Sequence, residues 1–151
     1  MWFECKIRYE KVTEKGLQKK VTEQYVVDAL SFAEAEERII EEMSHYISGE
    51  FEVTDVKKAS YKEVFFMSDG AKKSDTRWYK AKLQFITIDE RTAEEKRSNA
   101  TYLTEACSLH NALDNIDQVM KGTMLDYVQA NVGETAIMDV FEYRKDGDGK
   151  E

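Results

Sequence analysis

Hydrophobic and polar residues alternate over residues 2–10, where Phe3, Cys5 and Ile7 lie on one side of the chain and charged residues lie between them. A period of two residues is typical of a strand with one buried face. A polar stretch with one glycine then leads into a second segment rich in Val, Thr and Tyr, at about residues 20–27. The pattern predicts a β-hairpin at the start of the chain.

The pattern changes to a helical period after Ser31. Ser31 and Glu34 form a capping box, in which the serine oxygen accepts from a free backbone amide and the glutamate reaches back to the cap. Ala35, Ile39 and Met43 then recur at the spacing of one helix face. The segment therefore predicts a helix with one apolar stripe, and that stripe needs a sheet to cover.

Two further strands are expected after this helix, over residues 51–57 and 59–67. They are separated by a tight turn or a bulge, so we expect them to pair as a hairpin.

The second half of the chain repeats the same order of patterns. A hairpin is expected over 78–88 and 96–104, a helix after Ser108, and strands over 127–132 and 137–143. The matched positions are mostly apolar, and they include Trp2 with Trp78, Tyr25 with Tyr102, Ala35 with Ala112, Ile39 with Ile116, Met43 with Met120 and Phe65 with Phe141. An internal duplication explains these matches, and convergence on a common pattern is the alternative.

These patterns predict an α+β fold made of two duplicated ββαββ-like units, with an antiparallel sheet, two covering helices and a pseudo-twofold axis. The expected organisation is a first repeat over 1–67, a linker over 68–77 and a second repeat over 78–143. Together the repeats are expected to form one compact domain. The polar tail 144–151 is expected to be disordered.

Composition narrows the class of protein. The 151 residues are 42% hydrophobic, contain no proline and carry a net charge of −8. This charge disfavours binding to duplex nucleic acid. No apolar run approaches the ~20 residues of a membrane span, so a cytoplasmic protein without membrane contact is expected. Cys5 and Cys107 are interpreted as small core residues, and neither a metal site nor a cofactor is expected.

Three segments, at residues 2–9, 51–58 and 78–83, carry a family resemblance. The chain resembles a domain of unknown function found in Bacteroides-type bacteria and their bacteriophages, over about residues 2–143. The resemblance implies a small cytoplasmic protein of phage or prophage origin. It implies no known activity, cofactor or catalytic residue.

The candidate binding residues are two tryptophans and the basic side chains of the two hairpins. They are Trp2, Lys6, Arg8, Lys20, Trp78, Lys80, Lys82 and Arg97. Strand alternation places each tryptophan on the polar side of its strand, where an exposed ring could stack on a base. The alternative is that each ring packs under a neighbouring segment. The basic side chains could likewise follow a phosphate backbone or form cross-strand ion pairs.

No known catalytic motif is present in the sequence. The sequence therefore favours a non-enzymatic binding or adaptor protein that acts through an open sheet face or strand edges. A protein partner or self-association is expected. The alternative is a single-stranded nucleic-acid-binding protein of phage replication or recombination.

Overall fold

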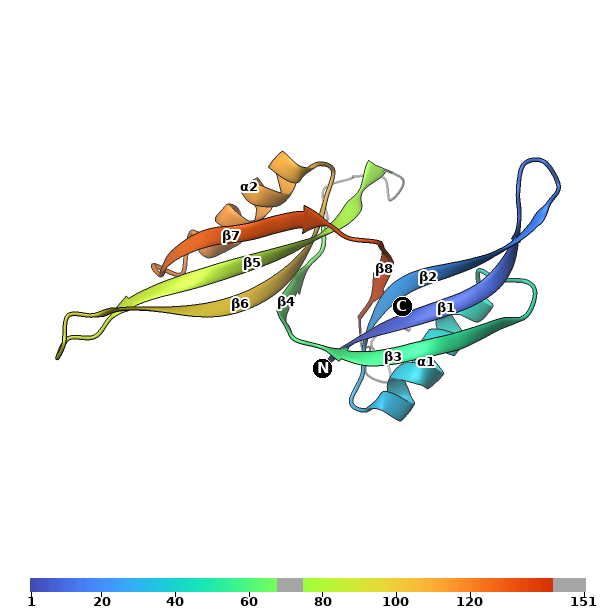
Figure 1. Ribbon diagram of the computed structural model, residues 1–151, viewed down its shortest axis with the longest axis horizontal. Helices are drawn as coiled ribbons and strands as arrows, with labels where there is room; N and C mark the ends of the chain where they lie inside the picture. Colours follow the sequence, from blue (N-terminus) through green and yellow to red (C-terminus); the bar gives the residue numbers. More distant parts are fainter. Residues whose placement is uncertain (68–74, 143–151) are drawn as a thin grey trace, which may run out of the picture. The chain divides into compact units, whose positions relative to one another are not determined.

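The computed structural model describes residues 1–67 and 75–142 (Figure 1). The elements of the first half are β1 (Trp2–Val12), β2 (Gln18–Asp28), α1 (Phe32–Ser44), β3 (Phe51–Ala59) and β4 (Tyr61–Phe65). Those of the second half are β5 (Arg77–Ile88), β6 (Glu95–Ala106), α2 (Leu109–Met120), β7 (Asp126–Glu134) and β8 (Ile137–Phe141). Each half thus has the order ββαββ, which confirms the predicted α+β class and its duplicated unit.

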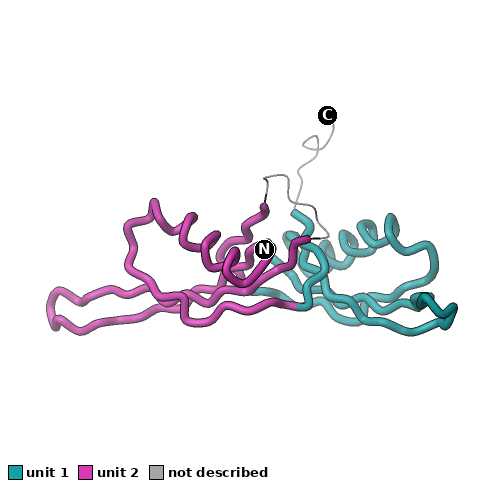
Figure 2. Tube along the Cα trace, turned by 90° about the horizontal axis from the view of Figure 1, so that it is seen from above, with its two compact units in different colours: residues 1–59, 136–151 teal, residues 60–135 magenta. Residues whose placement is uncertain are grey.

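The described chain forms two compact units, each with one four-stranded sheet (Figure 2). The first unit is Met1–Ala59 with the segment that begins at Ala136, and the second is Ser60–Thr135. Their strand orders are β3-β1-β2-β8 and β4-β6-β5-β7. The boundaries of these compact units differ from those of the two repeats expected at 1–67 and 78–143.

The difference arises because the last strand of each repeat pairs with a strand of the other repeat. β4 runs parallel to β6, and β8 runs parallel to β2 (Figure 1). The prediction of a hairpin between β3 and β4 is therefore wrong, and the sheets are mixed rather than antiparallel. Only Ser60 separates β3 from β4, which is too short for the two-residue loop of the tightest common hairpin.

We call β4 and β8 the exchanged strands, because each pairs with a strand of the other repeat. Equivalent aromatic pairs join each of them to its neighbouring strand. Tyr25 of β2 stacks on Phe141 of β8 with ring centroids 5.9 Å apart. Phe65 of β4 stacks on Tyr102 of β6 at 5.8 Å. Each pair joins a residue of one repeat to a residue of the other, and the repeat alignment maps one pair onto the other. The exchange is therefore the same at both ends of the duplication.

Irregularities in the sheets recur at matched positions. Between β1 and β3, Lys6 pairs with Asp55 and the next residue pairs with Val53, so Thr54 forms a bulge. Between β5 and β7 the pairing shifts after Lys82 in the same way, and Ala130 is left unpaired. A recurring bulge is a conserved device of a fold rather than a defect, so it supports the duplication independently of the apolar matches.

Each helix covers one face of its own sheet. In the first unit Ala35, Ile39 and Met43 of α1 are buried against a core that includes Phe3 and Ile7. In the second unit the matched residues of α2 are also buried, namely Ala112, Ile116 and Met120. The predicted apolar stripes are thus confirmed.

The two helices begin with related caps. Ser31 Oγ accepts from Glu34 N at 3.1 Å, and Glu34 Oε1 accepts from the backbone of Leu30 at 3.0 Å. Ser108 Oγ accepts from Asn111 N at 3.1 Å. Asn111 Oδ1 accepts from the Cys107 amide at 2.9 Å, so the asparagine takes the part of the capping glutamate.

Several other expectations have mixed outcomes. Cys5 is fully buried, as expected of a core residue. Cys107 is exposed, so the assignment of Cys107 to the core is wrong. Most of the predicted linker at 68–77 lies outside the described residues, although Arg77 already belongs to β5. The predicted tail at 144–151 lies entirely outside them.

Candidate functional site

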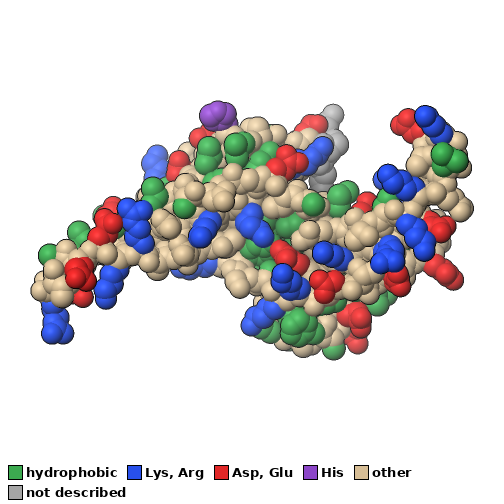
Figure 3. Space-filling view, viewed as in Figure 1, with side chains coloured by type: hydrophobic (Ala, Val, Ile, Leu, Met, Phe, Trp, Pro, Cys, Tyr) green, Lys and Arg blue, Asp and Glu red, His purple; other side chains and the backbone are tan. Residues whose placement is uncertain are grey.

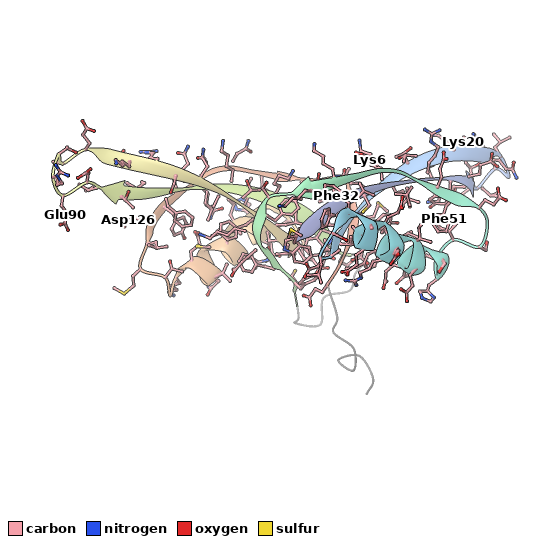
Figure 4. All side chains as sticks on the ribbon, turned by 90° about the horizontal axis from the view of Figure 1, so that it is seen from below. Lys6, Lys20, Phe32, Phe51, Glu90 and Asp126 are labelled. Carbon is pink, nitrogen blue, oxygen red and sulfur yellow. The ribbon has the colours of Figure 1, made fainter. Side chains whose placement is uncertain are left out.

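Each sheet has its helix on one face. On the opposite face, side chains of each hairpin are exposed toward the hairpin loop, whereas Val26 and Leu103 on that face are buried. We call these surfaces the first open face, on β1 and β2, and the second open face, on β5 and β6. Lys6 and Lys20 lie on the first open face, away from α1 (Figure 4). Lys80, Lys82 and Arg97 are the exposed basic residues of the second open face. The structure thus divides the predicted basic residues between two surfaces, as the duplication requires.

Basic and acidic side chains alternate across the first open face. Arg8 Nη1 lies 3.7 Å from Glu52 Oε1 of β3, and both side chains are well exposed. Lys6 lies opposite Asp55, and Lys20 lies opposite Glu10. Lys, Arg, Asp and Glu side chains are likewise intermixed over the surface in view in Figure 3. Exposed pairs of this kind contribute little to stability, and they leave no uniformly positive strip.

The second open face differs because its central lysine faces neutral residues. Lys82 lies opposite Thr101 on β6 and opposite Asn131 on β7. Asn131 occupies the place that Asp55 has in the first repeat. Arg97 donates to Gln84 Oε1 at 3.3 Å and to Glu95 Oε2 at 3.2 Å. The centre of this face is therefore basic and amide-rich, with carboxylates toward its end.

Trp2 and Trp78 do not occupy equivalent environments. Trp78 is only 3% exposed, and Phe66 meets it edge to face with ring centroids 5.2 Å apart. Trp2 is half-buried. The expectation that Trp78 presents a ring for base stacking is wrong, and the packing alternative holds for it. Phe66 follows the exchanged strand β4, so local sequence patterns could not place it against Trp78.

A surface hollow of about 570 Å³ lies at the far end of β1 and β2 in the first unit. Its lining includes Arg8 and Lys20 from the predicted set, together with Tyr9, Phe51 and Glu52. Burial and the nearby carboxylate of Glu23 raise the pKa of the Tyr9 hydroxyl above its ordinary value. The hollow can accept a polar group, but the Arg8 guanidinium already faces Glu52.

A polar network on β7 was missed by sequence reasoning. Tyr127 Oη donates to Asp117 Oδ1 at 2.6 Å, and Gln129 Nε2 donates to the same oxygen at 2.9 Å. Gln129 Nε2 also lies 3.1 Å from the carbonyl oxygen of Leu113. The hydrogen bond to Asp117 raises the pKa of Tyr127 to about 12. The network fixes β7 to α2, and comparison of the two repeats could have pointed to it because Ile40 stands where Asp117 would be.

Residues 1–143 match the family model described as Domain of unknown function (DUF4494). The chain belongs to this family. The DUF4494 match spans every strand and helix described above, so the resemblance to a domain of unknown function is confirmed. A search of curated proteins found no match.

Over residues 1–67 and 75–142, no group of three or more His, Cys, Asp or Glu side chains is arranged to hold a metal ion. Neither described helix has the length and apolar character needed to cross a membrane.

Proposed function

We propose that this protein is a non-enzymatic binding or adaptor protein that binds a partner protein through an open sheet face or a strand edge. The observation that carries the proposal is the coverage of each sheet by a single helix, which leaves rows of exposed side chains on the other face. Rigid sheets with one solvated face are suited to present such side chains to a partner.

A phage or prophage origin is part of the same proposal. It is supported by the resemblance of the three segments at 2–9, 51–58 and 78–83 to a family of Bacteroides-type bacteria and their bacteriophages. A protein of this origin would act in the cytoplasm of the infected or lysogenic cell.

Site-specific photocrosslinking in cells that produce the protein tests this proposal. A photoreactive residue at Lys6 or Lys82 would lie on an open face, whereas the same residue at Glu37 or Gln118 would lie on a helix exterior. We expect discrete protein adducts from the open-face positions and none from the two helix positions. Adducts confined to the helix positions, or no protein adducts at all, would contradict the proposal.

Single-stranded nucleic-acid binding is the second candidate function, and the second open face supports it. Lys80, Lys82 and Arg97 lie there around neutral Thr101 and Asn131. The net charge of −8 and the buried ring of Trp78 oppose it.

Fluorescence anisotropy with a labelled mixed-sequence single-stranded oligonucleotide tests this candidate at low salt. Binding should weaken as salt rises, because each lysine that contacts a phosphate displaces counterions. The double change Lys82→Glu and Arg97→Glu should weaken it by roughly tenfold or more, whereas Lys20→Glu on the first open face should have a smaller effect. No binding at low salt would eliminate this candidate.

A further inference from the structure

β7 forms an edge of the second sheet. It pairs with β5 on one side, and in the described structure no strand lies on its other side. An edge strand carries backbone N–H and C=O groups that can pair with another chain, so proteins usually protect such edges with charged side chains. The first repeat offers a direct comparison, because β3 is the matched edge strand of the first sheet.

The two edges differ in their protection. β3 carries Glu52, Asp55 and Lys57 within its length, whereas the matched residues of β7 are Val128, Asn131 and Gly133. Both strands keep the bulge at the matched position, so charge is the feature that has changed. Residues 127–133 of β7 contain no charged side chain. The edge of the second sheet thus lacks the charged side chains that guard the edge of the first.

Exposed apolar side chains lie beside this edge. Met124 is 95% exposed, Leu125 is 52% exposed and Val128 is 40% exposed. Met124 also has a φ of 57°, in the left-handed region that non-glycine residues seldom adopt. Backbone strain of this kind is often found at functional segments. The loop before β7 therefore presents apolar surface next to free backbone groups.

The edge is also held rigidly. Tyr127 and Gln129 both donate hydrogen bonds to Asp117 of α2, as described above. An ordered edge loses little conformational entropy when a strand adds to it. The hydrogen bonds lie on the helix side of β7, so they leave its outer backbone edge open to a partner.

We propose that β7 binds an extended segment of a partner protein, which adds to the second sheet as a further strand. The inference rests on the proposed binding function and names its surface. The segment should be uncharged and rich in β-branched residues at its centre, to match residues 127–133. It should have basic residues at its ends, because Asp126 and Glu134 terminate β7 and the chain is acidic overall.

A second copy of the chain fits this edge less well. Two β7 strands paired antiparallel about Ala130 would place Asp126 of one chain opposite Glu134 of the other. Like charges directly opposite each other destabilise a strand pair. The exposed pair of Glu134 with Arg77, at 4.0 Å, offsets this only weakly.

Selection from a phage-displayed library of random dodecapeptides tests the proposal. The full chain is the bait, and the enriched peptides are measured by fluorescence anisotropy. We expect neutral, β-branched centres with Lys or Arg at the ends. The variant Val128→Glu, Asn131→Asp and Gly133→Lys transfers the charges of β3 to β7 and should weaken binding by roughly tenfold or more.

Matched controls keep the result specific to the edge. Val128 and Asn131 are exposed, and a Cβ at Gly133 would meet no atom within 4 Å, so the triple variant should keep its fold, as circular dichroism would show. Thr92→Glu adds charge in the β5–β6 loop and should leave binding unchanged. The converse variant Glu52→Val, Asp55→Asn and Lys57→Gly should create a second binding edge on β3.

N-methylation of the peptide tests whether its backbone forms hydrogen bonds with β7. An added strand points the N–H groups of alternate residues toward β7, so N-methylation at one set of alternate positions should abolish peptide binding and at the other set should not. Equal loss from both sets would overturn the proposal. Binding unaffected by the triple variant would also overturn it, while protein binding elsewhere would still stand.

Two further outcomes would contradict the edge proposal. The first is that no peptide is enriched; the photocrosslinks from the open faces would then decide the wider function independently. The second is self-association of the wild type, seen by sedimentation, that the triple variant abolishes. That result would assign β7 to a second copy of the chain.

Discussion

Cys5 and its match in the second repeat, Ala81, occupy equivalent positions in the two cores. Both are fully buried under the helix of their own unit. Burial raises the pKa of the Cys5 thiol from 9.0 to about 12, and the carboxylates of Asp55 and Glu36 add to the effect. Cys107 is exposed, because it lies just before the cap of α2 rather than on its buried stripe.

The raised pKa of Cys5 predicts a loss of stability in alkali. The unfolded thiol ionises near its ordinary pKa of 9.0, whereas the folded thiol stays protonated until about 12. The contribution is therefore present below pH 9 and is lost as the pH rises toward 12. Urea unfolding across this range should show a falling free energy of unfolding.

Cys5→Ala places the residue of the second repeat at this site and provides the control. The variant should show a shallower decline than the wild type over the same pH range. Part of the decline should remain, because burial and a hydrogen bond to Glu23 also raise the pKa of Tyr25. An identical slope in both proteins would contradict the assignment to Cys5.

At the scale of the elements, local patterns predicted most of what the structure contains. The alternation in residues 2–10, the capping box at Ser31 and the stripe at Ala35, Ile39 and Met43 depend on neighbours within a few positions. The pairing of β4 does not depend on near neighbours, because Val64 pairs with a residue far along the chain. Sequence patterns therefore found the strand and not its sheet.

The same distinction applies to the candidate site. The basic residues of the two hairpins lie on exposed faces because strand alternation alone decides the side on which they project. Trp78 was expected on the same side, yet Phe66 covers it. The uncharged edge of β7 became significant only when the sheet order showed that β3 and β7 are edges.

The buried stripes predict equal consequences in the two helices. Ile39 and Ile116 are both fully buried at matched positions. Ile39→Ala and Ile116→Ala should each lower the free energy of unfolding by about 2–5 kcal/mol, through lost burial and the cavity that remains. Denaturant melts would measure this. Ile40→Ala, at a position 44% exposed, should cost much less, and a loss below about 0.5 kcal/mol at either buried site would remove that helix from its core.

At the scale of the whole molecule, the exchanged strands decide which pieces of the chain can fold. Residues 60–135 contain all four strands of the second sheet and α2. The repeat at 78–143 lacks β4 and carries β8, whose partner β2 is then missing. A fragment of 60–135 should therefore unfold cooperatively, whereas 78–143 should not.

Circular dichroism melts and amide chemical-shift dispersion of the two fragments would check this prediction. A fragment of residues 1–59 lacks β8 and serves as a further comparison; it should be less stable than 60–135. If 78–143 folded as well as 60–135, the compact units would follow the repeats after all.

The central claim is that each sheet is completed by the last strand of the other repeat. Nuclear Overhauser effects between backbone protons test it directly in a chain of 17.5 kDa. The parallel pairs predict interstrand effects between Val64 and Leu103 and between Val26 and Val140. Effects between Val56 and Val64 instead, as a hairpin of β3 with β4 would give, would contradict the exchange.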